Sequence, residues 1–275
     1  MSVHIEFGED LSRWGDYGYQ ELPLIFNGEP TGYKAIIRQG KLVNILGQGY
    51  VLLPHEYAIE IADQAASLVG LEPFSNVKVW GLKKFGDHSH VLVDDLEIPR
   101  QMRAVYLLPD ALEPIDGEEV HVGVDIFNSI DGSTAFGASI FTYRYVCENG
   151  VFMGKESVFS LRKIHTKSLN DVIEHLKYRL TQVMERAPEV LEAYRRLAEQ
   201  KITEKLIERI KKSRLSRKVL PDYITVEEIS PEVFQTSQWE LYNDITEAIW
   251  HNVKAGMKTK TFQFKVLHQV LGVSL

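Results

Sequence analysis

The chain has 275 residues, of which 44% are hydrophobic and 25% charged, and its formal net charge is -7. These proportions are close to those of ordinary globular proteins and exclude a disordered or fibrous chain, while the acidic excess excludes a histone-like positive coat. The single cysteine, Cys147, excludes an intramolecular disulfide and a Cys-rich zinc site. With no basic leader and no run approaching about 18 apolar residues, we expect a cytoplasmic protein with no membrane partner.

Residues 1–30 read as an acidic N-terminal arm, interrupted by glycines and prolines. This arm contains six of the chain's 38 acidic residues and one of its 31 basic residues. The rest of the chain therefore holds 32 acidic and 30 basic residues. The rest of the chain is therefore nearly balanced and can present a local basic surface.

Residues 31–220 are expected to form an α+β core that includes a long helix. Two short strands are predicted within Tyr33 to Tyr50, followed by a helix that begins after Pro54 and ends at Gly70. Further strands are predicted at Val77 to Leu82 and Val91 to Leu96, around a Gly86-Asp87 turn, and at Met102 to Leu108.

The strongest local prediction is a β-hairpin over His121 to Gly150 that turns at Asp131-Gly132. Its first arm alternates Val122, Val124 and Ile126 with polar neighbours, and its second arm places Phe141, Tyr143 and Tyr145 on one face. Turn chemistry accounts for the polar residues in between, which are Asn128, Ser129, Asp131 and Ser133. This hairpin therefore sets an aromatic face on a strand.

After Gly150 the pattern becomes helical, beginning at Ser168, with apolar residues every three or four positions from Ile173 to Ile210. This indicates one long amphipathic helix or a helical pair interrupted near Pro188. Residues 221–275 add two more helices, at Gln238 to Lys254 and Phe262 to Leu271. The predicted fold class is α+β, with antiparallel β-hairpins forming a central sheet packed with long C-terminal helices in a β-β-β-α-like core.

Catalytic signatures of the common kinds are missing from the sequence, so we expect no cofactor and favour a protein that is not an enzyme. His88 and His90, followed by Asp94, could contribute ligands to a metal, although exposed hairpin residues are the commoner explanation. Asp125, Asp131 and His165 could form an acid/base set, and Cys147 a nucleophile beside His165. A turn aspartate, a strand-end histidine and a buried cysteine explain them more often.

Basic and aromatic residues alternate from Phe141 to Lys167, which is the combination that proteins binding single strands use for phosphates and bases. The candidate nucleic-acid-binding residues in this stretch are Tyr143, Arg144, Tyr145, Lys155, Arg162, Lys163, His165 and Lys167. A second basic patch consists of Lys211, Lys212, Arg214, Arg217 and Lys218. Core packing of the strand aromatics and a solvated helix end are the plainer alternatives.

Several ordered motifs resemble a phage/plasmid-like family that carries a domain of unknown function. They are Asp125-Ile-Phe-Asn128-Ser129-Ile-Asp131-Gly132-Ser133, Tyr143-Arg144-Tyr-Val-Cys147-Glu-Asn149-Gly, Arg162-Lys-Ile-His165-Thr166 and Trp239-Glu-Leu-Tyr242-Asn243-Asp-Ile-Thr246-Glu. The resemblance covers roughly Tyr33 to Val270. One departure is Asp244-Ile245, where a small residue such as Ala is expected.

The resemblance implies no established activity, but it places the chain among proteins of mobile elements. The order of strands and long helix is also similar to the core of the RecT/Redβ-type single-strand annealing proteins, by analogy of fold alone. We therefore expect a homo-oligomeric protein that binds or anneals single-stranded DNA. The alternatives are a metal-dependent nuclease that uses His88, His90, Asp94 or Asp125, and a module that binds a host protein.

Overall fold

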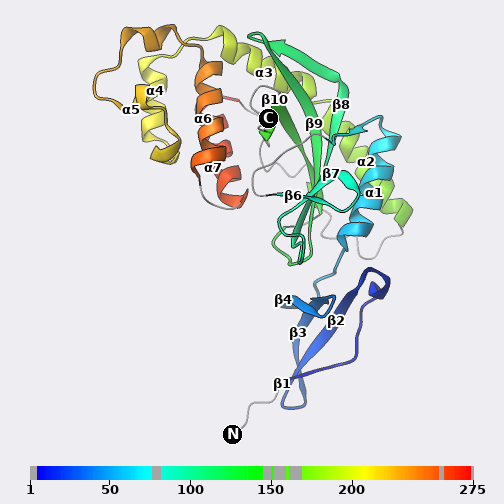
Figure 1. Ribbon diagram of the computed structural model, residues 1–275. Helices are drawn as coiled ribbons and strands as arrows, with labels where there is room; N and C mark the ends of the chain where they lie inside the picture. Colours follow the sequence, from blue (N-terminus) through cyan, green and yellow to red (C-terminus); the bar gives the residue numbers. More distant parts are fainter. Residues whose placement is uncertain are drawn as a thin grey trace.

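The computed structural model describes residues 5–75, 82–134, 136–144, 150–151, 159–160, 169–253 and 257–273. It shows an α+β fold with two antiparallel sheets, as the sequence predicts (Figure 1). A small N-terminal sheet lies at one end, and the larger central sheet appears in Figure 1 between α1 (His55–Leu68) and α2 (Leu169–Met184) on the right and the C-terminal helices on the left.

The N-terminal sheet has the strand order β1-β2-β3-β4. Its strands are β1 (Ile5–Phe7), β2 (Tyr19–Phe26), β3 (Glu29–Arg38) and β4 (Lys41–Gly47), with a short 3-10 helix, η1 (Gly15–Tyr17), before β2. The segment expected to be an arm thus supplies β1 and β2. An Asn27-Gly28 turn, with both residues at positive φ, joins β2 to β3 and favours a tight hairpin.

The inner face of this sheet has its own small core, which includes Tyr19, Ile36 and Val43. Trp14 packs into it and donates its indole N–H to the carbonyl of Leu52, 3.0 Å away. Ile130, at the end of the central hairpin, completes the cluster. These contacts fasten the N-terminal sheet to the rest of the chain.

The central sheet has the order β11-β10-β9-β8-β7-β6. Its main strands are β6 (Lys83–Phe85), β7 (His88–Val93), β8 (Gln101–Ile115), β9 (Glu118–Ser129) and β10 (Gly137–Arg144). The short strands β5 (Glu72–Pro73), β11 (Gly150–Val151) and β12 (Phe159–Ser160) pair with β8 or β10. The predicted Gly86-Asp87 turn joins β6 and β7, but residues 76–81, where the first arm was expected, lie outside the described residues.

The predicted central hairpin is confirmed as β9 and β10, with Asp125 opposite Ser139 and Phe141 opposite Gly123. Strand β8 is longer than expected and runs through Pro109 and Pro114. The register of β8 on β9 shifts between Leu107 and Leu112, so the segment that contains Pro109 leaves the regular ladder. A proline lacks the N–H that a regular ladder position needs, and this shift accommodates it.

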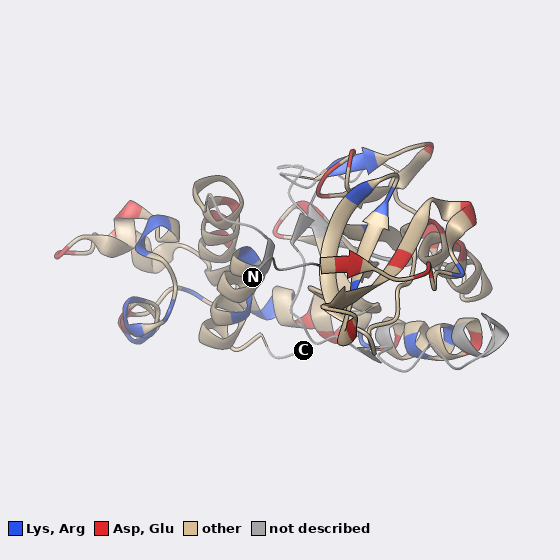
Figure 2. Cartoon of the chain, turned by 90° about the horizontal axis from the view of Figure 1, so that it is seen from below, with Lys and Arg blue, Asp and Glu red and all other residues tan. Residues whose placement is uncertain are grey.

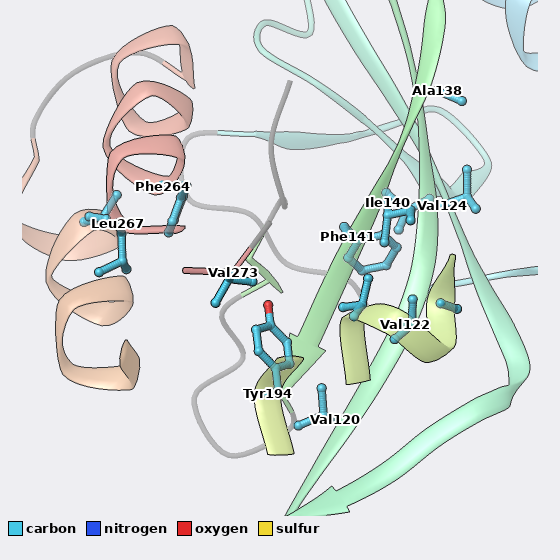
Figure 3. Close-up of a cluster of buried hydrophobic side chains, with 14 of the residues drawn as sticks. Val120, Val122, Val124, Ala138, Ile140, Phe141, Tyr194, Phe264, Leu267 and Val273 are labelled. Carbon is cyan, nitrogen blue, oxygen red and sulfur yellow. The ribbon is translucent and has the colours of Figure 1, made fainter. Parts of the chain in front are cut away.

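Two helices, α1 (His55–Leu68) and α2 (Leu169–Met184), pack against each other and against the central sheet. Their sheet partners are β8 and β9 for α1 and β10 for α2. The main hydrophobic core between the central sheet and the helices includes Val120, Val122 and Val124 from β9 (Figure 3). The predicted alternation on this strand therefore buries the face that the sequence assigned to the core.

The remaining helices form a C-terminal group, most of which lies to the left of β10 in Figure 1. They are α3 (Ala187–Glu199), α4 (Glu204–Lys212), η3 (Arg217–Val219), α5 (Asp222–Thr225), η4 (Pro231–Gln235), α6 (Gln238–Asn252) and α7 (Met257–Leu271). The predicted interruption near Pro188 is confirmed by the boundary between α2 and α3. A second break, at residues 200–203, comes from a tertiary contact, because Ile202 donates its N–H to the Thr236 carbonyl. Within the described ranges, no helix has both the length and the apolar character that crossing a bilayer requires.

Candidate nucleic-acid interface

The second predicted basic patch, residues 211–218, runs from the last residues of α4 into η3 and is called the basic turn below. Helix α4 begins at Thr203, whose side chain accepts the N–H of Leu206, and buries Leu206, Ile207 and Ile210. It ends where Ser213 donates its hydroxyl to the Ile210 carbonyl, 2.7 Å away. Cations in the last turn of α4 lie beside the negative end of the helix dipole, which stabilises them there.

Buried residues and hydrogen bonds hold the basic turn in place. Leu215 and Val219 are buried, and the N–H of Ser216 donates to the Gln263 side chain of α7 at 2.7 Å. From α6, Asn252 donates its side-chain amide to the Lys218 carbonyl at 3.2 Å. Because these anchors alternate with the basic residues, the cations are left on the outer surface.

All five cations of the basic turn are exposed. Lys212 pairs with Glu208, 2.9 Å away on the same helix, and Lys211 donates to the Val226 carbonyl. In the part of the chain that the structure describes, Arg214, Arg217 and Lys218 have no carboxylate within ion-pair distance. Figure 2 shows blue and red segments interspersed over the C-terminal helices, so the surroundings of the turn are mixed in charge.

A pocket of about 500 Å³ opens beside the basic turn, between it and α6. Arg217 and Lys218 line one part of it, together with His251 and Asn252. The lining also contains three carboxylates, those of Asp222, Asp244 and Glu247. Asp244 accepts a hydrogen bond from the Tyr223 hydroxyl at 2.6 Å, so the pocket combines cations, acceptors and an imidazole in one space.

Most of the first predicted basic stretch lies outside the residues whose side chains the structure describes. This applies to Tyr143, Arg144, Tyr145, Lys155, Arg162, Lys163, His165 and Lys167. For Tyr143 and Arg144 the backbone is placed at the end of β10, opposite His121 and Val120. Phe141, the first ring of the predicted aromatic face, is fully buried and belongs to the core.

The two histidines of the predicted metal site, His88 and His90, have ring centroids 6.2 Å apart, but the predicted aspartates do not complete a site with them. His90 contacts Asp63 at 2.9 Å, whereas Asp94 accepts the backbone N–H groups of Arg100 and Gln101 and closes a loop. Asp125 pairs with Arg103, and Asp131 accepts the N–H of Ser133 within the turn. Among the described residues, no group of three or more His, Cys, Asp or Glu side chains is placed to hold a metal ion.

Asp125 is fully buried in the central sheet, with Arg103 on β8 and Ser139 on β10 as neighbours. Burial raises the pKa of Asp125 to about 6, and the positive charge of Arg103 opposes that rise. Its Oδ1 atom makes no hydrogen bond. The ion pair is enclosed by strands, and we interpret it as part of the packing of the sheet.

Sequence reasoning missed a buried polar chain that connects the sheet to the C-terminal helices. The Thr142 hydroxyl lies 3.0 Å from that of Tyr194, which lies 2.9 Å from the Tyr242 hydroxyl. Tyr242 in turn lies 3.2 Å from Nε2 of His268. Burial lowers the pKa of His268 to about 4, so its imidazole is neutral at neutral pH. Figure 3 shows Tyr194 between the end of β10 and α7.

A second buried contact assigns a role to Asn128, which turn chemistry had been taken to explain. Asn128 donates its amide to the Leu53 carbonyl at 2.8 Å and lies 3.1 Å from Nδ1 of His55. His55 Nε2 donates to the Pro99 carbonyl, and burial lowers the pKa of His55 to about 3. Asn128 and Tyr242 both belong to the motifs quoted above, and that was the only sequence signal for them.

Comparison with known proteins gives one match. The model of a family described as a domain of unknown function, DUF932, matches residues 44–270. No curated protein and no solved structure matches the chain.

Proposed function

The chain belongs to the DUF932 family, whose function is unknown, and on that premise we propose that it binds single-stranded nucleic acid through the basic turn. The observation that carries this proposal is the exposure of five cations within eight residues on a turn held by buried anchors. A positive array of this kind attracts phosphates, and its fixed backbone needs little ordering when it binds them.

The pocket beside the basic turn indicates where the phosphates and the bases of a single strand would bind. Phosphates would contact Arg214, Arg217 and Lys218, of which Arg217 and Lys218 share the lining of the pocket with the carboxylates. The carboxylates of Asp222 and Glu247 would accept hydrogen bonds from the exocyclic amino groups of unpaired bases. Such groups are accessible when a base is unstacked, so this arrangement favours a single strand over a duplex.

The order of elements supports annealing as the form that this activity takes. Strands β8, β9 and β10 follow one another as a meander, and α2, which comes after the two-residue strands β11 and β12, packs against β10. This is the β-β-β-α order that we compared with RecT/Redβ-type annealing proteins, and the similarity is one of fold alone. We place the activity in the cytoplasm, on DNA of a phage, plasmid or other mobile element.

Fluorescence anisotropy with a labelled single-stranded oligonucleotide tests the proposal across a salt series. The double variant Arg217→Ala/Lys218→Ala removes two cations, and we expect the salt dependence of its affinity to fall by about 0.7 in log–log slope per lost contact. Lys83→Ala/Arg100→Ala is the matched control, because both residues are exposed cations far along the chain from the turn. The control should bind as the unmodified protein does.

Absence of binding at low salt would overturn the proposal. Equal loss of affinity in the two double variants would show that overall charge, and not the basic turn, carries the binding. Cleavage of the oligonucleotide in the presence of Mg²⁺ would contradict the non-enzymatic form of the proposal and favour a nuclease. A second assay, with two complementary oligonucleotides, measures annealing directly.

A further inference from the structure

The N-terminal sheet has one face that is apolar and open to solvent, which we call the outer face. The exposed residues Ile5, Phe7, Phe26, Tyr33, Leu42 and Ile45 are each between 43% and 64% exposed. The strand register places them together, because Ile5 pairs with Phe26 and Leu42 with Ile37. Ile45 pairs with Ala35, which pairs with Leu22, so the face is continuous across the sheet.

The opposite face of the sheet already has a partner. It carries Tyr19, Ile36 and Val43, which are buried in the cluster with Trp14 and Ile130. Figure 1 shows the N-terminal sheet extending beyond the body of the molecule. The outer face is therefore accessible to another molecule.

The size of the outer face matches what a stable interface requires. With a typical area of roughly 200 Å² for a large side chain, the six exposed residues present about 600 Å². This is at the upper end of the apolar patches found on monomers, which are roughly 300–600 Å². Two such faces in contact would bury about 1,200 Å², which is the lower end of the range of specific protein–protein interfaces.

The chemistry of the face indicates what covers it. In the described strands, Glu29 beside the β2–β3 turn is the only charged residue whose register places it on this face. Residues 1–30 carry six acidic residues and one basic residue, and an anionic membrane surface repels that charge. An apolar face without cations offers little to a charged partner, whereas it is complementary to a copy of itself.

We propose that the outer face is the interface of a homodimer, in which the N-terminal sheets of two copies pack face to face. Sheets that pack in this way lie about 10 Å apart and interdigitate their side chains. A two-fold axis through the contact would place Leu42 and Ile45 of one copy against the same patch on the other. The interface does not involve the basic turn, so it stands independently of nucleic-acid binding.

Sedimentation velocity over a concentration series tests this proposal with the full chain. The unmodified protein should form a dimer, and Leu42→Lys/Ile45→Lys should raise the dimer dissociation constant on the order of a hundredfold, because two charges would be buried in each copy. The matched control is Leu68→Lys/Leu96→Lys, which changes two similarly exposed leucines outside this sheet. Thermal unfolding by circular dichroism checks that both variants fold.

Because the contact is apolar, added salt should leave the dimer intact while it weakens nucleic-acid binding. A second measurement uses the variant Cys147→Ser/Ile45→Cys with a spin label on the introduced thiol. Two labels across the two-fold axis should give a short distance, and a label at position 68 should not. A monomer at all concentrations would overturn the proposal, as would a dimer that Leu42→Lys/Ile45→Lys leaves unchanged or one that holds the labels at position 45 far apart.

Discussion

Gly123 lies directly opposite Phe141 in the β9–β10 ladder, and the phenyl ring occupies the space above the glycine. A Cβ atom at Gly123 would lie 2.3 Å from Cε1 of Phe141 and equally close to the Tyr106 carbonyl oxygen. Both distances are far below van der Waals contact, so a side chain cannot fit there unless the strands move. This glycine lets a large ring cross the centre of the sheet.

We therefore predict that Gly123→Ala destabilises the fold by roughly 1–3 kcal/mol or more, as overpacking of a core does. Urea denaturation measures the change in the free energy of unfolding. Gly47→Ala is the control, because a Cβ at that exposed position of β4 meets nothing within 4 Å. Equal stability of the two variants would show that the ring of Phe141 can move aside at little cost.

The buried histidines predict how stability depends on pH. The pKa of His268 is lowered to about 4 and that of His55 to about 3, whereas the unfolded chain has the ordinary value of 6.5. Their contribution to the free energy of unfolding is complete above pH 6.5. It is lost as the pH falls toward the folded-state pKa values, because only the unfolded chain takes up protons on these histidines in that range. Each histidine lowers the free energy of unfolding by about 1.4 kcal/mol per pH unit in that window.

The variant His268→Gln removes one of these contributions. Its free energy of unfolding should fall less steeply than that of the unmodified protein between about pH 6.5 and pH 4, in urea titrations at a series of pH values. Leu68→Gln, at an exposed position that does not titrate, should keep the original slope. Parallel curves for His268→Gln and the unmodified protein would contradict the assignment of a neutral, buried His268.

The ion pair of Arg103 and Asp125 predicts a pH dependence of opposite sign. Because the folded pKa of Asp125, about 6, lies above its usual 3.8, its stability contribution is present at low pH and is lost as the pH rises through about 6. Arg103→Met removes the positive charge that lowers the pKa of Asp125. The loss of stability with rising pH should therefore extend above pH 6 in this variant. Breaking such a pair should cost about 3–5 kcal/mol at alkaline pH and less near pH 5.

The double variant Arg103→Met/Asp125→Asn is the control for this prediction. It lacks the buried carboxylate at position 125, so the difference between its stability at pH 5 and pH 8 should be smaller than that of Arg103→Met alone. Chemical denaturation at the two pH values provides the comparison. A destabilisation of Arg103→Met that is the same at both pH values would mean that packing of the arginine stem, not its charge, explains the effect.

Local patterns in the sequence were enough to predict several elements. The alternation of Val122, Val124 and Ile126 predicted the buried face of β9, and Asp131-Gly132 predicted the turn that follows it, where Gly132 has a positive φ. Pro54 and Gly70 marked the ends of α1. These signals act over a few residues, because side-chain alternation and backbone conformation are set by near neighbours.

The N-terminal segment shows where local reasoning failed. Its acidic residues and glycines indicated an arm, although the Asn27-Gly28 turn signal and the apolar positions of β2 were present. Those apolar positions gain their partners from β1, β3 and β4, so their role depends on the whole sheet. The basic turn was visible in the sequence, but its anchors Gln263 and Asn252 come from later helices.

The sequence by itself determined the α+β class, the central hairpin, the main helical segments and the presence of a basic run at residues 211–218, since composition and periodicity express these directly. Only the tertiary structure decided that Asn128 contacts His55, 73 positions away, and that Tyr194 meets Tyr242 in the core. It also decided that Phe141 is buried and that β1 to β4 share an open apolar face. Contacts between distant segments depend on how the elements pack, and no pattern within a single element encodes them.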